Sequence, residues 1–90
     1  MRTISEKMVI NNLKIIRQNM KMSQETVARK AGITLSAYRR IEYWQAQPSG
    51  LFLLAIAEAL KVEPKTVFRV INKFDLEKYK KQYKISDYRK

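Results

Sequence analysis

Residues 23–42 constrain the fold more than any other stretch, because they carry the start and stop signals of two short helices in a row. The hydroxyl groups of Ser23 and Thr34 can each accept a hydrogen bond from a backbone N–H left unpaired in a first helical turn. Gly32 falls where the first helix must end, at a position that commonly needs a positive φ. The pattern predicts a helix over residues 24–31, a tight turn, and a second helix over about 34–43.

The second predicted helix has two chemically different faces. At about 100° per residue, Thr34 and Tyr38 point to the same side as Ile41 and Glu42. The other side carries two arginines and a hydroxyl, on Ser36, Arg39 and Arg40, together with Tyr43. A face of this composition can lie in a groove of DNA, where arginine and serine donate hydrogen bonds to base edges.

At these residues the sequence resembles the helix-turn-helix of the lambda-type phage repressor family, the Cro/XRE-like group of transcription regulators. The matching positions in the motif are Gln24, Val27, Ala28, Gly32, Ile33, Tyr38 and Ile41. Further matches outside it are Leu13, Arg17, Met20, Pro48, Ser49, Leu53, Ile56, Ala57, Leu60 and Val62. The resemblance spans roughly residues 8–68. It implies an all-α, five-helix lambda-repressor-like domain, which we place at residues 4–68, followed by a C-terminal extension at 69–90.

The resemblance also implies which positions contact DNA. The base-reading positions of the family fall on Leu35, Ser36 and Arg40. Arg40 can donate a bidentate pair to guanine, and Leu35, which replaces a residue that is usually polar, offers an apolar contact to a thymine methyl group. Gln24 matches a position that bonds the phosphate backbone.

Other candidate contacts come from residues beside these positions. Arg39 lies to one side of the base-reading face, where a phosphate contact is expected, and Tyr43 and Gln45 are further phosphate donors. In the family, the residues matched by Arg17 and Glu42 pair with each other. An arginine beside the apolar stripe needs such a partner, since an unpaired buried charge is costly.

The charge and the missing residue types narrow the function further. The 90 residues carry a net charge of +11, with a pI near 10.1, which implies a polyanionic partner. The chain has no cysteine and no histidine, so we expect no metal site, no cofactor and no enzymatic activity. No segment has the apolar length of a membrane span, so we expect a cytoplasmic protein without a membrane partner.

The N-terminal segment reads as a helix. Thr3 to Glu6 fits a capping box, and the spacing of Val9, Leu13, Ile16 and Met20 predicts an amphipathic helix running to about Met20.

After the motif, Trp44 stands where the family commonly has glycine. We therefore expect the recognition helix to end differently, with Trp44 either packed on the edge of the core or wedged against a sugar.

The C-terminal extension is basic and rich in aromatic residues. Asp75 can begin a helix in which Leu76, Tyr79 and Tyr83 line one side. Three interpretations remain open: a dimerisation element, a basic arm along DNA phosphates, or a tail that orders on binding.

Two further apolar residues, Leu51 and Leu54, lie on a different side of the fourth helix from its core residues and suggest self-association.

These observations predict a double-stranded DNA-binding regulator that acts as a repressor and binds a near-palindromic operator as a homodimer. Two alternatives remain open. The domain can be the antitoxin of a toxin–antitoxin pair whose C-terminal extension binds a small protein partner. It can also be a helix-turn-helix used to bind protein or RNA.

Overall fold

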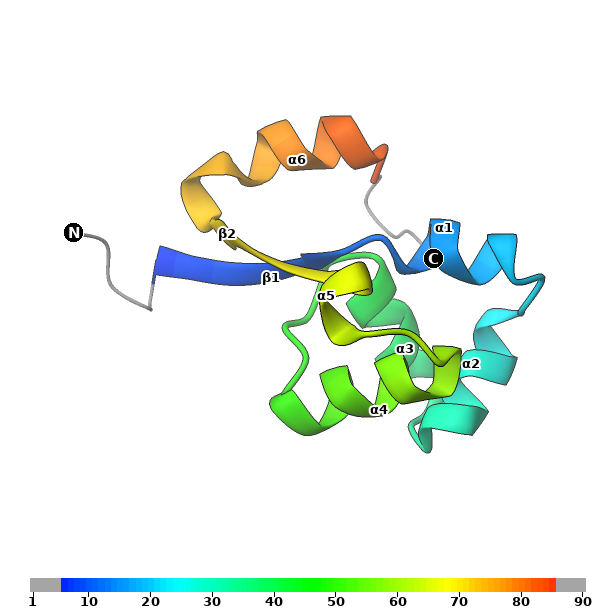
Figure 1. The fold of residues 1–90 in the computed structure, drawn as a ribbon. Coiled ribbons are helices and arrows are strands. Elements are labelled where there is room, and N and C mark those ends of the chain that lie inside the picture. The colour runs from blue at the N-terminus through cyan, green and yellow to red at the C-terminus, as the bar shows by residue number, and fades with distance from the viewer. Residues whose placement is uncertain (1–5, 86–90) are drawn as a thin grey trace.

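A computed structural model describes residues 6–85, and it places a two-stranded ribbon between two helical layers (Figure 1). The larger layer holds α1 (Leu13–Asn19), α2 (Gln24–Ala31), α3 (Leu35–Glu42), α4 (Gly50–Leu60) and α5 (Pro64–Val67). The ribbon pairs β1 (Lys7–Asn11) with β2 (Phe68–Asn72). A short 3₁₀ turn, η2 (Lys73–Asp75), leads into α6 (Leu76–Tyr83), which crosses the other side of the ribbon.

The prediction of one helix from the N-terminal segment to Met20 is wrong. Residues 7–11 form β1, and α1 begins only at Leu13. β1 runs antiparallel to β2, with Val9 opposite Val70 and Asn11 opposite Phe68. Buried Asn11 stops the strand and starts the helix, because its side-chain Oδ1 accepts a hydrogen bond from the Leu13 N–H (3.0 Å). Residues 3–5 of the expected capping box, including its Thr3, lie outside the described residues.

The all-α, five-helix description therefore needs correction. Residues 6–85 contain six α-helices and a two-stranded sheet. The ribbon is short, but it joins the two ends of the described chain. Its strand β2 also crosses the expected domain boundary after residue 68. None of the described helices is long and apolar enough to cross a membrane.

The two faces of the ribbon contribute to two separate cores. The main core lies among α1 to α5 and includes Leu13, Val27, Tyr38, Ile56 and Phe68, with Val9 packed against it from β1. The second core holds Ile10, Ile71 and Trp44, against which Leu76, Tyr79 and Tyr83 of α6 pack. Because side chains alternate along a strand, the continuous apolar run Met8–Ile10 supplies both cores.

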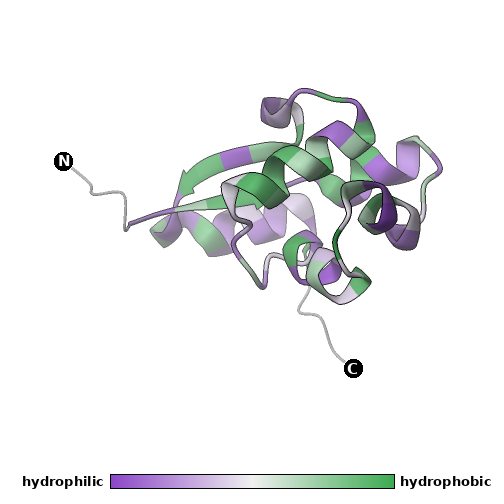
Figure 2. Ribbon diagram, turned by 90° about the horizontal axis from the view of Figure 1, so that it is seen from below, coloured by the Kyte–Doolittle hydropathy of each residue, from purple (hydrophilic) through white to green (hydrophobic). Residues whose placement is uncertain are grey.

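Helix α4 is apolar on nearly every side, and Figure 2 shows it in mostly green and white. Ile56, Ala57 and Leu60 are buried in the main core. Leu51 and Leu54, however, are 75% and 57% exposed. A helix with this composition is usually covered all round, so α4 has an apolar face without a partner among the described residues.

Candidate nucleic-acid interface

The helix-turn-helix predicted from residues 23–42 is present, with both expected caps. The Ser23 Oγ accepts a hydrogen bond from the Thr26 N–H (3.0 Å), and the Thr34 Oγ1 accepts one from the Ala37 N–H (3.0 Å). Gly32 ends α2 with a φ of 76°, a left-handed conformation that glycine adopts without a steric penalty. Val27 and Ala28 of α2 are buried in the main core together with Tyr38 and Ile41 of α3, so the two helices of the motif are packed against the same core.

The outward side of α3 gathers the predicted base-reading residues. Ser36 and Arg40 are exposed, whereas Leu35 and Arg39 are half-buried. With Gln45 they line one shallow hollow of about 450 Å³. The structure thus brings together five of the seven residues expected to contact DNA, on an exposed helix face that carries two positive charges.

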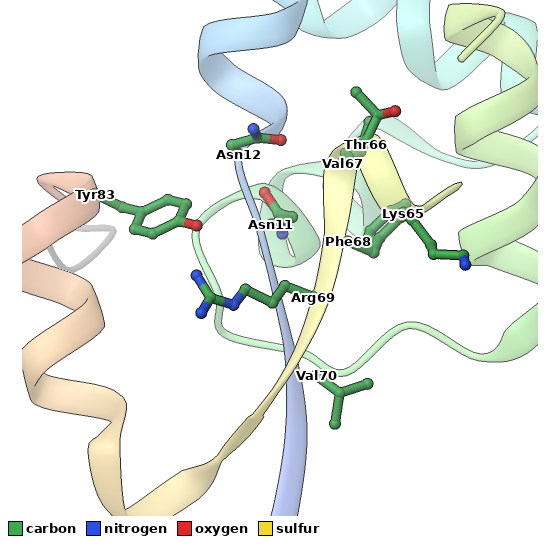
Figure 3. Close-up of a pocket in the computed structure, with 9 residues that line it drawn as sticks. All are labelled: Asn11, Asn12, Lys65, Thr66, Val67, Phe68, Arg69, Val70 and Tyr83. Atoms are coloured by element: carbon green, nitrogen blue, oxygen red, sulfur yellow. The ribbon is translucent and has the colours of Figure 1, made fainter. Parts of the chain in front are cut away.

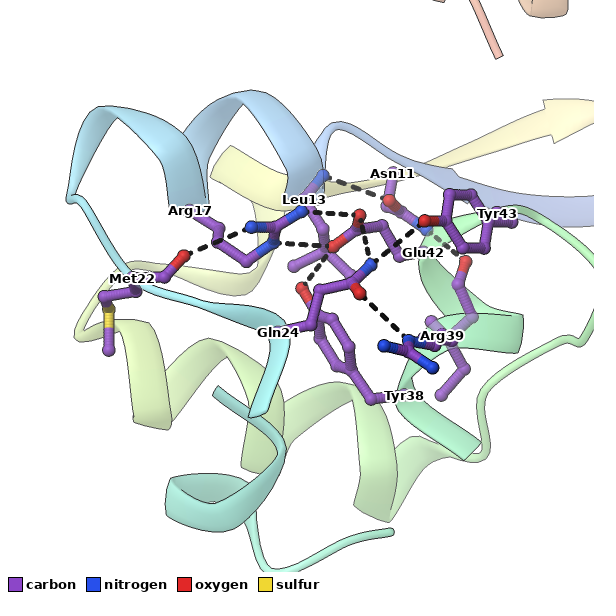
Figure 4. A network of polar contacts seen from close by, with 10 residues as sticks. Asn11, Leu13, Arg17, Met22, Gln24, Tyr38, Arg39, Glu42 and Tyr43 are labelled. Atoms are coloured by element: carbon purple, nitrogen blue, oxygen red, sulfur yellow. Dashed lines mark hydrogen bonds and ion pairs between the residues drawn. The ribbon is translucent and has the colours of Figure 1, made fainter. Parts of the chain in front are cut away.

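The inward side of α3 ends in a buried ion pair (Figure 4). Glu42 is only 1% exposed, and its two carboxylate oxygens accept hydrogen bonds from the Arg17 Nε and Nη2, both at 2.9 Å. A third bond comes from the Tyr38 hydroxyl (2.7 Å) and a fourth from the Gln24 amide (3.0 Å). Arg17 also donates to the Met22 carbonyl (3.2 Å), so this contact ties α1 and the start of the motif to α3.

The surroundings keep Glu42 ionised. Burial by itself would raise the pKa of its carboxyl group, but the hydrogen bonds from Arg17 and Tyr38 outweigh burial and lower that pKa below its ordinary value. The hydrogen bond with Glu42 raises the pKa of Arg17. Burial, and then the charge of Glu42, raise the pKa of the Tyr38 hydroxyl, which therefore stays protonated as a donor.

A chain of hydrogen bonds extends this ion pair to the outer face. The Gln24 amide nitrogen donates to Glu42 and to the Tyr43 hydroxyl (3.3 Å), while its oxygen accepts from the Arg39 Nε (3.0 Å). Both amide hydrogens of Gln24 are thus used inside the protein. Arg39 makes this bond through its Nε and not through its terminal nitrogens, so the hydrogen bonds hold a guanidinium group at the edge of the outer face (Figure 4).

Trp44 ends the recognition helix in a way that the sequence pattern did not specify. It takes the left-handed conformation (φ 63°) that a glycine would otherwise provide. Its indole is 7% exposed, donates a hydrogen bond to the Asn11 carbonyl (3.0 Å), and packs against Tyr83 of α6 at 5.4 Å between ring centroids. Trp44 therefore packs on the edge of the core, which is one of the two roles expected from the sequence.

Asn11 and Gln47, which the sequence pattern did not indicate, hold the end of α3 and the loop that follows it. The buried Asn11 amide donates to the Ile41 carbonyl (2.8 Å). The Gln47 side chain bonds both the N–H (2.6 Å) and the carbonyl (3.0 Å) of Val9. The only sequence signal was the type of residue, because Asn and Gln carry both a donor and an acceptor. Among residues 6–85 no group of three or more acidic, histidine or cysteine side chains could hold a metal ion.

Solved structures of other proteins are similar to part of this chain. The restriction-modification controller protein C.AhdI from Aeromonas hydrophila has 33% sequence identity and a TM-score of 0.60, over 61% of this chain and 83% of that one. The DNA-binding domain of the P22 C2 repressor has 26% identity and a TM-score of 0.57, over 60% and 71% of the two chains. A putative DNA-binding protein from Bacteroides fragilis is similar in fold, with 24% identity and a TM-score of 0.61, over 69% of this chain and all of that one.

No curated protein matches the chain in sequence. The sequence profile of the helix-turn-helix family, however, matches residues 13–67, which run from the start of α1 to the end of α5 and make up more than half of the chain. These residues include the buried ion pair and the whole outer face of α3. The protein therefore belongs to the helix-turn-helix family, in its XRE or lambda-repressor type.

Proposed function

We propose that this protein is a sequence-specific DNA-binding transcription regulator, and that it represses by occluding promoter DNA at a near-palindromic operator. The observation that carries the proposal is the outer face of α3, where Leu35, Ser36, Arg39 and Arg40 surround one hollow with Gln45. The related controller and repressor proteins support the assignment.

Each residue of this face has a distinct proposed role. Arg40, which is exposed, donates two hydrogen bonds to a guanine, which is the commonest specific contact in the major groove. Ser36 bonds a neighbouring base with weak discrimination, and Leu35 contacts a thymine methyl group. Arg39 binds a phosphate with its terminal nitrogens, because its Nε is held by Gln24.

Gln24, Tyr43 and Gln45 complete the proposed phosphate contacts. Gln24 contributes through Arg39 and Tyr43 rather than by a free amide hydrogen, since both of its hydrogens are already donated inside the protein. The net charge of +11 adds an attraction to DNA that depends on salt and not on base sequence.

The regulator is proposed to act as a homodimer. One helix in a groove reads only a few base pairs, at about 1–3 kcal/mol for each good contact, so useful specificity needs two copies. Two recognition helices then lie about one DNA turn apart, roughly 34–36 Å. Two surfaces offer apolar contacts to a second copy: Leu51 and Leu54 on α4, and Val70 with Phe74 in the C-terminal extension.

The test is selection from a pool of random DNA duplexes at physiological salt, over several rounds, followed by sequencing of the enriched sites. We expect an inverted repeat whose half-sites are about one helical turn apart. Arg40→Ala should relax one position in each half-site, at a cost of about 1–3 kcal/mol. Arg29→Ala removes the same charge from the exposed surface of α2, outside the hollow, and should leave the preferred sequence unchanged.

Salt-sensitive binding without any enriched sequence would contradict the proposal, since only the general positive charge would then act. So would an enriched sequence that Arg40→Ala and Arg29→Ala change equally.

A further inference from the structure

The two edges of the β1–β2 ribbon differ in whether a side chain bonds their outward-facing backbone groups. On the β1 edge, the Gln47 side chain bonds both the N–H and the carbonyl of Val9 and so takes the place of a neighbouring strand. Both groups of Val9 thus point away from β2. Val9 and Val70 therefore form a non-hydrogen-bonded pair of the antiparallel ladder, and the N–H and carbonyl of Val70 must point away from β1 as well.

The β2 edge at Val70 has no such cover. No side chain of residues 6–85 takes there the place that Gln47 takes on the other edge. The Val70 side chain is 63% exposed. A hollow of about 410 Å³ is lined by the six consecutive residues from Lys65 to Val70, together with Asn11, Asn12 and Tyr83 of α6. Figure 3 shows Arg69 and Val70 pointing to opposite sides of the strand. Open strand edges pair readily with other chains, and proteins usually block them.

We propose that this edge is where a second copy of the chain binds, by pairing β2 with β2 of the partner subunit in antiparallel register centred on Val70. The proposal rests on the homodimer of the proposed function and selects its contact surface. A two-fold axis requires the same patch on both copies. β2 meets this requirement around Val70, which is the middle residue of Phe68–Asn72 and has its backbone N–H and carbonyl facing outward. The Phe68 N–H is already donated to the Pro64 carbonyl, so the pairing depends on the backbone groups of Val70.

The side chains suit this register. Val70 lies beside Val70 of the partner subunit, and Phe68 lies opposite Asn72 of the partner subunit. Arg69, the one charged residue within the strand, lies opposite the apolar Ile71 of the partner subunit, so no cation faces a cation across the axis. The two ribbons then join into a continuous four-stranded sheet.

The size of the contact predicts when it forms. Stable dimers bury about 1,200–2,000 Å² in total, and a pair of five-residue strands offers less than this. We therefore expect a weak dimer in free solution. It should become strong when two copies sit on neighbouring half-sites of one DNA molecule, because their effective concentration is then high.

The first test is a disulfide at the axis. The chain has no cysteine, so Val70→Cys introduces a single thiol. Hydrogen-bonded antiparallel partners have Cα atoms about 5.5 Å apart, which is within the range of a disulfide. Under mild oxidation, with and without DNA, Val70→Cys should form covalent dimers at least about tenfold faster than the matched variant Leu54→Cys, which reports on the exposed face of α4. Faster dimer formation by Leu54→Cys, or equal rates, would overturn the proposal.

The second test is a charge exchange at the same exposed position. Val70→Lys and Val70→Asp each place like charges at the axis and should weaken self-association in sedimentation by about tenfold, whereas an equal mixture of the two should restore it. Circular dichroism checks that both variants stay folded. Unchanged association, or a mixture that is no better than either variant, would overturn the proposal.

The two proposals can fail separately. Inverted-repeat sites that are still selected by both charged variants would retain the regulator and refute the β2 contact. A Val70→Cys crosslink in a protein that selects no DNA sequence would retain the β2 contact and refute the regulator.

Discussion

Replacing Glu42 with glutamine tests the buried ion pair that links α1, α2 and α3. The substitution keeps the shape of the side chain but removes its charge and turns one acceptor oxygen into an NH₂ group. Each carboxylate oxygen accepts one Arg17 N–H, so one of these N–H groups loses its acceptor whichever way the amide is turned. Breaking one partner of a buried ion pair costs about 3–5 kcal/mol. That is a large part of the 5–15 kcal/mol by which domains are typically stable.

The assay is urea unfolding followed by circular dichroism. At pH 7 we expect Glu42→Gln to lower the free energy of unfolding by about 3–5 kcal/mol. Glu58→Gln is the matched control, because Glu58 is an exposed carboxylate on α4, and it should change stability by less than about 0.5 kcal/mol.

The pH dependence has a definite sign. The pKa of Glu42 is lower in the folded protein than its ordinary value of 4.5, so the unfolded chain binds the proton more readily. The stabilising contribution is therefore fully present above about pH 4.5, and it is lost as the pH falls through the folded pKa. The difference between wild type and Glu42→Gln should shrink on acidification. A difference below about 1 kcal/mol at pH 7, or one that stays constant into acid, would refute the account.

Three further substitutions test how the ribbon and the helix ends are held. Trp44→Gly relieves a positive φ but removes a buried indole, so we expect thermal unfolding to show a net loss of about 2–4 kcal/mol; a gain would mean that the indole packing contributes little. Gln47→Ala leaves the N–H and carbonyl of Val9 without their partner, which should cost about 1–2 kcal/mol and speed hydrogen exchange of the Val9 amide; unchanged exchange would contradict this role. Lys61→Gly should stabilise the protein by about 1 kcal/mol, because Lys61 ends α4 in the left-handed conformation (φ 58°), and a lower melting temperature would refute that reasoning.

The local signals in the sequence predicted the helix-turn-helix well. Ser23, Thr34 and Gly32 act within one or two turns of their own position, so their roles depend little on the rest of the chain. The periodicity of α3 separated Ser36 and Arg40, which are exposed, from Tyr38 and Glu42, which are buried. The spacing of these residues along the sequence is sufficient to separate the exposed from the buried ones, because the geometry of one helix determines which residues share a face.

The sequence predicted correctly which residues form the apolar side of the C-terminal helix. It did not predict what that side contacts. Leu76, Tyr79 and Tyr83 pack on the second core, as a one-sided pattern suggests. Their neighbours there, Ile10 and Trp44, lie far away in the sequence. No local rule specifies such a contact.

By itself, the sequence determined the two capped helices of the motif and the two faces of the recognition helix. Only the tertiary structure decided that residues 7–11 form a strand. Val9 fits a helical stripe with Leu13 as well as it fits a strand, and the choice depends on a partner about sixty residues away at Val70. The same distant pairing places Asn11 and Gln47 where their amides can bond the backbone. Strand hydrogen bonds join separate parts of the chain, whereas helix hydrogen bonds close within four residues, and this is why the sequence pattern specified the helices of the motif but not the ribbon.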